Sequence, residues 1–525
     1  MASDDRLCVV GIDAADEALV ERWCAEGALP TLDRLRRIGT SVPLRHADAH
    51  PSGSVWPTIY TGTHPGRHGI VHPLSIVPGT LRLQSVVPDA CPEPPVWSLL
   101  AEAGARSIVV DVPFARLSRD PGSLHVVDWA AYERPRPPRS WPSDLLGEVV
   151  RHAGPYPVQR DLSRNPAASE AERWEDHAQL VAGVAVKGSA LRRLLTRHPW
   201  DFFMAIFTEA HAAGHHFWDL EFAPDGARRG RPSSHPLRDV YRAIDTELGR
   251  ILDVLDLTTT TLVVLSGHGM GRNVGGWHLV EPFLRAAGLL VAPPPSAGSV
   301  LGRLRGACPT WIRRSVSRHL PEAVRTSMTQ YWHLGGIDPR RTRAFALPSD
   351  QHGFVRINLA GREREGLVRL DREYDALCRD LTASLRALVD PGTGRAVVRD
   401  VFHADDAFPG PERHRLPDLV VSWRDEAPIE AIRLEDGTLV AEPSPDARSG
   451  NHRPDGFAVV CGAGLPRGRA SNGHLLDVAP TVLGHFGLEP RAAMPGRSWL
   501  PSAPGADGVD ARRPWSRSGR GAYDA

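Results

Sequence analysis

Short, continuous apolar segments alternate with longer segments of helical apolar spacing along most of this chain. The apolar segments are RLCVVGID, RSIVVDVPF, WDFFMAIF, TTLVVLSGHG and GFAVVCGAG. A strand that is apolar on both faces has to be covered on both sides, which is typical of parallel sheets flanked by helices. The sequence therefore predicts an α/β fold of three layers, with a large, mostly parallel sheet between two layers of helices.

Polar side chains that can bind metals follow three of these predicted strands directly. Asp13 follows 7–12, Glu209, His211 and His215 follow 202–207, and Ser266 and His268 follow 261–265. In open α/β sheets, ligands bind beyond the carboxyl ends of the strands. We therefore expect a site at this edge of the sheet.

The stretch TEAHAAGHHFW, residues 208–218, places three histidines within six positions. His211 and His215 are four residues apart, so they share one face if the stretch is helical, or they converge from a tight loop at Gly214. Two imidazoles and a third ligand suit zinc or a similar metal. The alternative is that these histidines are ordinary surface or supporting residues. Glu209 is a candidate hydrogen-bond partner for a ligand imidazole, and His216 is expected to pack with the two aromatic residues that follow it.

The segment HPSGSVWPTIYTGTHPGRHGI, residues 50–70, carries two serines ahead of a predicted helix. Proline is tolerated in the first turn of a helix, so Pro57 predicts a helix that begins near Ser54. A hydroxyl there lies in the positive field of the helix terminus, where a phosphate is well held. Serine is a weak nucleophile unless a base or a metal lowers its pKa, and no G-x-S-x-G motif is present. A metal-activated serine and a simple N-cap at Ser54 are both consistent with the segment.

Composition excludes several classes of protein. The chain has 525 residues and 62 of each charge sign, so its formal net charge is +0 and neither nucleic acid nor a membrane surface is an expected partner. Six scattered cysteines without a C-x-x-C pair indicate neither a zinc ribbon nor a disulfide framework. The sequence shows no signal peptide and no apolar run of about 20 residues. We therefore expect a cytoplasmic protein.

Two segments differ from the alternating pattern. Residues 290–345 open on a proline run and become basic and helical, which predicts an inserted cap or lid. Residues 502–525 are rich in glycine, serine, arginine and aspartate, and we expect a disordered tail there.

Several motifs, taken together and in this order, resemble the alkaline phosphatase superfamily and most closely its type I phosphodiesterase/nucleotide pyrophosphatase branch. They are VVGIDAAD, SGSVWPTIYTGTHPGRHGI, EAHAAGHHFW, LSGHGMG, GFVRINLAGRE, LPDLVVSW, GNHRPDGFAVVCGAG and LDVAPTVLGHFGLEP followed by MPGRSWL. They span about residues 7 to 500. The resemblance implies an alkaline phosphatase-like fold and one domain over residues 1–500, since one site would draw on residues 13 to 452.

The resemblance also implies a site with two metals and a phosphoseryl intermediate. One metal would be held by Asp13, Ser52 and His268, and the other by His211, His215 and His452. The family nucleophile lies nine residues before the threonine of a Thr-Gly pair. Counting back from Thr61 gives Ser52, whereas the local capping pattern favours Ser54. We therefore expect Ser52 to be the nucleophile and Ser54 to be the N-cap of the helix.

This chain departs from the family pattern at two ligand positions. Relatives have S-D-H-G where this chain has Gly267 between Ser266 and His268. Relatives have Asp-x-x-x-His where this chain has His211 and His215. The three-histidine set keeps an open position, which is typical of a catalytic zinc site, whereas the other set loses an anionic ligand. We expect one or two divalent ions per chain, Zn²⁺ first and Mn²⁺ as the alternative.

The resemblance implies a metal-dependent hydrolase of phosphate mono- or diesters, with a small, nucleotide-like diester or pyrophosphate as the first substrate. A descendant that binds metal and an anion with little or no turnover is an alternative, because Gly267 replaces a ligand. A phosphotransferase of the same fold is a further alternative. A sulfatase is excluded, because no cysteine lies in a Cys-x-Pro-x-Arg motif.

Overall fold

The computed structural model describes residues 6–86, 89, 91–130, 136–158, 162, 167, 169–224, 231, 233–293, 337–470 and 472–500. The chain divides into two compact units. The first contains residues up to 68, 87–273 and those from 447 onward, and the second contains 69–86 and 274–446. Asp13, Ser52 and all four histidines assigned to the site belong to the first unit.

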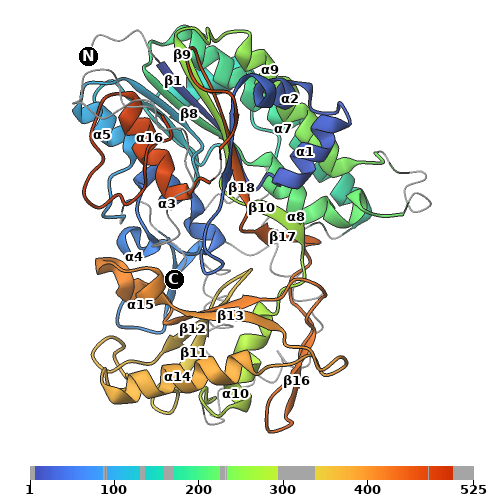
Figure 1. Cartoon of the computed structure of the whole chain (residues 1–525), viewed down its shortest axis with the longest axis vertical. Coiled ribbons are helices and arrows are strands. Elements are labelled where there is room, and N and C mark those ends of the chain that lie inside the picture. The colour runs from blue at the N-terminus through green and yellow to red at the C-terminus, as the bar shows by residue number, and fades with distance from the viewer. Residues whose placement is uncertain are drawn as a thin grey trace. The chain divides into compact units, whose positions relative to one another are not determined.

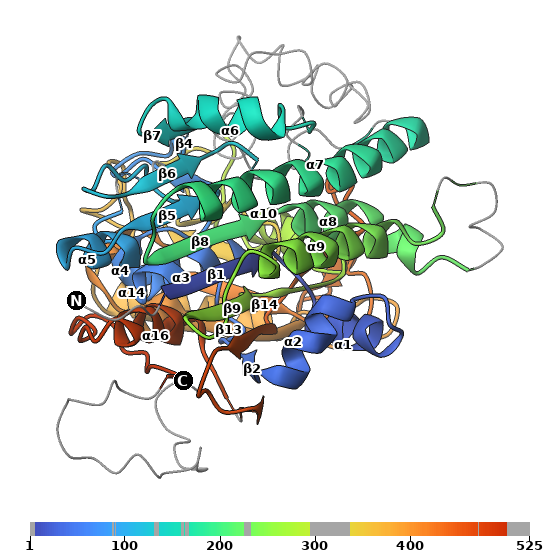
Figure 2. The ribbon, with the colours of Figure 1, turned by 90° about the horizontal axis from the view of Figure 1, so that it is seen from above.

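A nine-stranded sheet is the centre of the first unit (Figure 1). Its strands lie in the order β19-β2-β18-β9-β1-β8-β5-β6-β7, and Figure 2 shows β5, β8, β1 and β9 following one another. The central pairs, β1 with β8 and with β9 and β5 with β8, are parallel, whereas β18 runs antiparallel to both β9 and β2. The predicted large, mostly parallel sheet is confirmed.

The sheet strands and one separate ribbon have the following bounds: β1 Arg6–Ile12, β2 Thr40–Leu44, β5 Ser107–Val110, β6 Leu124–Val127, β7 Arg139–Trp141, β8 Phe202–Phe207, β9 Thr260–Ser266, β18 Gly456–Cys461 and β19 Gly468–Arg469, with the ribbon formed by β10 Gly269–Arg272 and β17 Gly450–Arg453. The helices of this unit are α1 Glu17–Ala25, α2 Pro30–Ile38, α3 Val55–Thr61, α4 Pro65–His68, α5 Val96–Glu102, α6 Leu145–Ala153, α7 Glu170–Arg197, α8 Glu209–Glu221, α9 Pro236–Leu252 and α16 Val478–His485, with short 3₁₀ helices η1 Ser52–Ser54 and η6 Leu475–Asp477.

Both faces of the sheet are covered by helices, because its central strands are apolar on both sides. Along β1, Cys8 and Val10 pack into a core with α1, α2, α7, α8 and α9, whereas Leu7 and Val9 pack into a second core with α3, α5 and α16. Figure 1 shows these two groups of helices on opposite sides of the strands. The three-layer arrangement is the one that the apolar strands predicted.

The parallel register places three strand ends side by side. Ile12 at the end of β1 pairs with Phe207 at the end of β8, and Gly11 pairs with Leu265 near the end of β9. The residues that follow these strands therefore leave the sheet at one edge. The antiparallel ribbon β10–β17, in which Met270 pairs with His452, adds a fourth segment.

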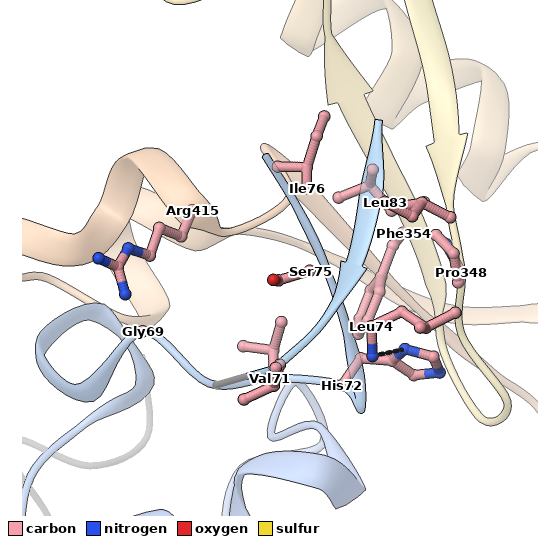
Figure 3. A pocket seen from close by; sticks show the side chains of 12 residues that line it. Gly69, Val71, His72, Leu74, Ser75, Ile76, Leu83, Pro348, Phe354 and Arg415 are labelled. Carbon is pink, nitrogen blue, oxygen red and sulfur yellow. Dashed lines mark hydrogen bonds between the residues drawn. The ribbon is translucent and has the colours of Figure 1, made fainter. Parts of the chain in front are cut away.

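The second unit has a four-stranded sheet in the order β11-β12-β14-β13. Its elements are β3 Leu74–Ile76, β4 Leu83–Ser85, η4 Trp277–Leu279, α10 Val280–Ala286, β11 Ala344–Leu347, β12 Gly353–Ile357, α14 Arg372–Arg386, β13 Val398–His403, α15 Ala404–Ala407, η5 Pro411–Arg415, β14 Leu419–Trp423, β15 Ala431–Arg433 and β16 Leu439–Ala441. Leu74 and Leu83 of the hairpin β3–β4 line a small pocket with Pro348 and Phe354 (Figure 3). None of the predicted site residues lines it.

The motifs GFVRINLAGRE and LPDLVVSW meet in this second unit and form a buried ionic network. Arg362 donates to the two oxygens of Asp418 at 2.9 and 2.7 Å, and Arg356 donates from Nε to Glu363 Oε1 at 2.7 Å. The hydroxyl of Tyr374 donates to Asp418 at 3.0 Å. These two motifs therefore serve the packing of the second unit.

Most of the predicted cap at 290–345 and the whole tail at 502–525 lie outside the described residues. The extent of one domain over residues 1–500 stays a prediction. No helix among the described residues is long and apolar enough to cross a membrane.

Candidate metal centre

Asp13 follows β1 and begins a tight turn, which is held in place by a hydrogen bond to the end of the neighbouring strand β9. Ala14 has a φ of 55°, in the left-handed region that few residues other than glycine adopt. The backbone N–H of Ala15 donates to Ser266 Oγ at 2.9 Å, and that hydroxyl donates to the carbonyl of His268 at 2.9 Å. Ser266 thus ties the turn after β1 to the turn after β9, a role that sequence reasoning did not assign to it.

Helix α8 begins directly after β8 and carries both His211 and His215. Of the two alternatives, a helix and a tight loop at Gly214, the structure has the helix. His215 is fully buried, His211 is half-buried, and His216 is buried against the ring of Phe217. The expected packing of His216 is observed against Phe217.

The glycine at position 450 allows α8 and β17 to approach closely enough for their histidines to meet. A Cβ on Gly450 would lie 2.1 Å from the carbonyl oxygen of Gly214, a distance that no side chain could occupy. The backbone N–H of Ser449 donates to the carbonyl of His215 at 2.8 Å. This close contact positions His452, two residues further along β17, beside the two histidines of α8.

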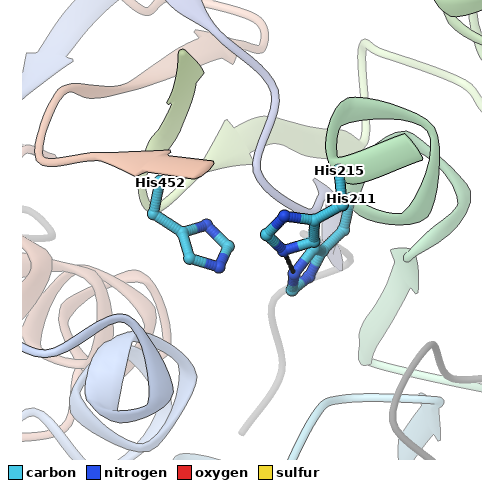
Figure 4. A group of neighbouring side chains, drawn as sticks. All are labelled: His211, His215 and His452. Carbon is cyan, nitrogen blue, oxygen red and sulfur yellow. Dashed lines mark hydrogen bonds between the residues drawn. The ribbon is translucent and has the colours of Figure 1, made fainter. Parts of the chain in front are cut away.

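His211, His215 and His452 form one compact group (Figure 4). One ring nitrogen from each histidine lies within 4.8 Å of the other two. The Nε2 atoms of His211 and His215 are 2.9 Å apart. Figure 4 shows the ring from β17 facing the two rings from α8 across a common space. Among the described residues, this is the one group of three or more such side chains whose ligand atoms converge in this way.

In His211 and His215, the Nδ1 atom hydrogen-bonds away from the histidine group, which leaves the Nε2 lone pair directed toward the other histidines. His215 donates from Nδ1 to the carbonyl of Gly450 at 2.8 Å, and His211 donates from Nδ1 to Asp13 Oδ2 at 2.7 Å. With both Nδ1 atoms protonated, the two Nε2 lone pairs face each other. A proton or a metal ion is required between them, since two lone pairs at that distance repel.

The donor set fits a divalent metal. Two imidazole nitrogens bound to zinc at a tetrahedral angle lie about 3.3 Å apart, given Zn–N distances of about 2.0–2.1 Å. The observed 2.9 Å between the Nε2 atoms is within a few tenths of an ångström of that spacing. Burial lowers the pKa of His215 well below its usual value, and the charge of Arg448 lowers it further. Burial and the charge of His268 act in the same direction on the pKa of His452, so both imidazoles are neutral and each has a nitrogen lone pair that a metal ion could accept.

Asp13 is an ionised carboxylate at the edge of this group. Burial by itself raises its pKa, but the positive field and hydrogen bond of His211 outweigh burial and hold the pKa of Asp13 below its usual range. Its second oxygen, Oδ1, accepts a hydrogen bond from the indole N–H of Trp56 at 2.7 Å. Trp56 belongs to α3, so this bond ties the helix that follows the two serines to the end of β1.

His268 lies next to the three-histidine group. Its ring centroid is 4.6 Å from that of His452 and 6.0 Å from that of His211, and its Nδ1 is 4.0 Å from Asp13 Oδ1. The structure therefore brings together Asp13 and all four predicted histidines.

The two serines have different surroundings. Ser54 is fully buried and donates from Oγ to the carbonyl of Pro51 at 2.6 Å. It occupies the N-cap position of α3, but its side chain makes no capping bond. The expectation that Ser54 caps the helix with its side chain is therefore wrong, because its hydroxyl bonds backward to Pro51. Ser52 is half-buried at the first position of η1.

Glu209 does not act as the partner of a ligand imidazole. It accepts a hydrogen bond from Tyr156 at 2.8 Å and lies 3.3 Å from the buried ammonium of Lys187. Glu209 lies two residues before His211 and therefore on another side of α8. Its side chain points toward Tyr156 and Lys187 and away from the histidines. Asp13 takes the expected role instead.

The comparisons with known proteins agree with this fold. A family model described as type I phosphodiesterase / nucleotide pyrophosphatase matches residues 7–436. Among solved structures, the wild-type alkaline phosphatase PafA has a TM-score of 0.54 at 13% identity, covering 95% of this chain and 99% of that one. Phosphonoacetate hydrolase from Sinorhizobium meliloti 1021, in complex with phosphonoformate, has a TM-score of 0.51 at 15% identity, covering 90% and 94%. No curated protein matches the sequence.

The nine-stranded sheet between two helical layers, with its site at the strand ends, defines an alkaline phosphatase-like α/β protein. The chain belongs to the type I phosphodiesterase/nucleotide pyrophosphatase family.

Proposed function

We propose that this protein hydrolyses phosphoric esters with the help of a divalent metal held by His211, His215 and His452. The observation that carries the proposal is the distance of 2.9 Å between the Nε2 atoms of His211 and His215, with a third histidine beside them. Membership of the phosphodiesterase family supports the choice of phosphoric esters.

The metal would supply Lewis acidity, which polarises a phosphoryl oxygen and stabilises the charge of the transition state. The protein's own residues hold and orient it. Asp13 and the carbonyl of Gly450 fix the Nδ1–H tautomers of His211 and His215, so that both Nε2 atoms stay available. Three imidazoles favour zinc, and manganese is the alternative.

Ser52 is the proposed nucleophile. Of the two serines, Ser54 is fully buried with its hydroxyl proton committed to Pro51, whereas Ser52 is half-buried at the start of η1. In the first step a bond forms between Ser52 Oγ and phosphorus, and the bond from phosphorus to the leaving oxygen breaks. The serine proton passes to solvent, and the leaving oxygen takes a proton from solvent to depart as an alcohol, or departs as a phosphate. Water then attacks phosphorus, the bond from phosphorus to Ser52 Oγ breaks, and the phosphate product is released as the serine hydroxyl is restored.

The proposed substrates are nucleotide-type diesters or pyrophosphates, the substrates named in the description of the family. Phosphonoacetate hydrolase, which shares the fold, was solved with phosphonoformate, a small phosphonate. We therefore include simple phosphonates and phosphate monoesters in the substrate panel.

One structural observation favours a second candidate, a binding protein with little turnover. At Gly267, where relatives have a carboxylate ligand, the space for a side chain is filled by Val55 and Ile59. Loss of that ligand would weaken catalysis that depends on a second ion.

The test compares three proteins loaded with Zn²⁺ or Mn²⁺: wild type, Ser52→Ala and Ser54→Ala. We expect wild type to cleave thymidine 5′-monophosphate p-nitrophenyl ester, Ser52→Ala to lose at least about 100-fold in rate, and Ser54→Ala to keep most of it. Intact-mass analysis after an acid quench should show a thymidine 5′-phosphoryl group on wild type, because only p-nitrophenol leaves, and none on Ser52→Ala. Equal metal-dependent rates for wild type and Ser52→Ala would remove Ser52 from the mechanism, and no turnover of any substrate would favour the binding protein.

A further inference from the structure

We propose that this site holds one metal ion per chain, and that Asp13 positions His211 instead of binding a second ion. This inference rests on the proposed function for the identity of the ion. It departs from the two-metal arrangement that the family pattern implies.

The first argument is the use of both Asp13 oxygens. Oδ1 accepts from the indole N–H of Trp56 and Oδ2 accepts from Nδ1 of His211, each at 2.7 Å. A second ion bound to Asp13 would have to share an oxygen with one of these short bonds. The carboxylate is buried between these two partners. Asp13 is therefore satisfied without a second ion.

The second argument is the volume around Gly267. A Cβ built on Gly267 would lie 2.3 Å from Cγ1 of Val55 and 2.8 Å from Cδ1 of Ile59. Two apolar side chains of α3 thus occupy the space into which a carboxylate at position 267 would extend. Apolar groups cannot solvate a divalent ion. The place of the lost ligand is therefore filled by the side chains of Val55 and Ile59, and no oxygen atom is supplied there for a second ion.

The third argument is charge. Asp13 is the single carboxylate among the six residues that the family pattern assigns to the site. Two divalent ions would carry four positive charges against that one carboxylate. A buried site with this balance holds one dication far better than two.

The geometry of the donors agrees with one ion. Within the described residues, His211, His215 and His452 are the only set of three or more histidines, cysteines or carboxylates with converging ligand atoms. Asp13 and His268 do not complete a second set of this kind, and Asp13 Oδ1 lies 4.0 Å from Nδ1 of His268. The hydrogen bond from His211 to Asp13 instead has the form of a carboxylate–histidine–metal relay, which orients the ligand and raises its basicity.

The test measures metal content and affinity, apart from activity. Metal is removed from the wild-type protein with a chelator, and the protein is then dialysed against excess Zn²⁺. Unbound zinc is removed by gel filtration, and the bound zinc is measured by inductively coupled plasma mass spectrometry. The expected result is close to one zinc per chain. Close to two would overturn the proposal. His215→Ala is expected to hold close to none, and close to one would also overturn it.

Asp13→Asn separates a positioning residue from a ligand. If Asp13 positions His211, the variant keeps one site whose zinc affinity, measured by competition with a chromophoric chelator, falls about 10- to 100-fold. If Asp13 binds a second ion, the variant loses one of two ions and the affinity of the other stays unchanged. Titration with Co²⁺ supplies a second signature, since wild type should show one tetrahedral absorption band that saturates at one equivalent. Biphasic saturation at two equivalents would contradict the inference.

The two proposals fail separately. One zinc per chain with no ester hydrolysis removes the proposed function and keeps the metal inference. Two zincs per chain with hydrolysis removes the metal inference and keeps the proposed function.

Discussion

His211 donates a hydrogen bond from Nδ1 to Oδ2 of Asp13 at 2.7 Å, although 198 positions separate the two residues in the sequence. The bond connects the end of β1 with helix α8, because β1 and β8 are parallel neighbours whose ends are in register. It fixes the tautomer of His211 and directs its Nε2 toward His215. The proposed metal site therefore depends on the pairing of two strand ends as much as on the histidines.

Metal binding should stabilise the folded protein. A ligand that binds only the folded state adds about 2.7 kcal/mol to the free energy of unfolding at 100 times its dissociation constant. We expect Zn²⁺ to raise the melting temperature of the chelator-treated wild type and to have no such effect on His452→Ala. Differential scanning calorimetry measures both, and the exposed His152→Ala serves as the control that keeps the full increase. An equal zinc-dependent increase for His452→Ala would show that the metal binds elsewhere.

Gly267→Ala should destabilise the protein. The added Cβ would lie 2.3 Å from Cγ1 of Val55, and overpacking of this kind costs about 1–3 kcal/mol. Val55→Ala removes the obstructing methyl groups, so the double variant should lose less stability than the two single losses together. Urea denaturation of the four proteins gives the coupling energy. Simple additivity would mean that the two side chains do not compete for the same space.

Asp418→Ala should cost about 3–5 kcal/mol of folding free energy, because it leaves buried cations without their partner. Asp418 accepts hydrogen bonds from Arg362, from Tyr374 and from the backbone N–H of Ile357. Burial raises the pKa of Asp418, but the hydrogen bonds and charge of Arg362 more than reverse this, so its pKa lies below the usual value.

The matched control for this variant is Asp400→Ala, which breaks an exposed ion pair with Arg386. Exposed pairs contribute about 0–1 kcal/mol. Chemical denaturation should therefore separate the two variants by at least about 2 kcal/mol. Equal losses would show that burial of the network contributes nothing.

The stability of the fold should decrease as the pH falls below neutrality, partly through His125. Burial lowers the pKa of His125 to about 3, and its Nδ1 accepts the backbone N–H of Ser118 at 2.8 Å. Its pKa in the unfolded chain is about 6.5. Between these two values the unfolded state binds a proton that the folded state does not, so acidification favours unfolding.

For one such histidine, the difference between neutral pH and about pH 5 amounts to about 2 kcal/mol. His125→Asn keeps an acceptor for Ser118 but cannot titrate, so its free energy of unfolding should fall less over this range. Urea denaturation at a series of pH values measures both slopes. Parallel curves for wild type and variant would contradict the low pKa of His125 in the folded state.

Local pattern was sufficient to predict the elements and part of the site. Apolar segments such as FFMAIF have apolar side chains on both faces of a strand, so both faces must be covered by helices. These segments form β8 and its neighbours in the nine-stranded sheet. The spacing of His211 and His215 was sufficient to predict one helical face, because side chains four residues apart lie together on any α-helix. The position of polar residues after strands indicated the edge of the sheet at which they meet.

The roles of individual site residues depend on contacts that the local pattern does not contain. Glu209 was a reasonable partner for a ligand histidine by position, but Lys187 and Tyr156 hold it, and Asp13 takes that role. The hydroxyl of Ser54 was expected to cap α3, but it bonds to Pro51. In each case several partners were within reach in sequence, and packing selected one of them.

The sequence by itself determined the layered α/β fold, the helical pairing of His211 with His215 and the loss of a carboxylate at Gly267, because periodicity and residue type are local properties. Only the tertiary structure decided that Val55 and Ile59 fill the space at Gly267, that Trp56 and His211 use both oxygens of Asp13, and that β17 brings His452 to α8. The physical reason is that one volume holds only one side chain, and one hydrogen-bonding atom accepts only a few partners. Many distant groups could fill each place, and the pairing of the strands and the packing of the helices against the sheet decide which group does.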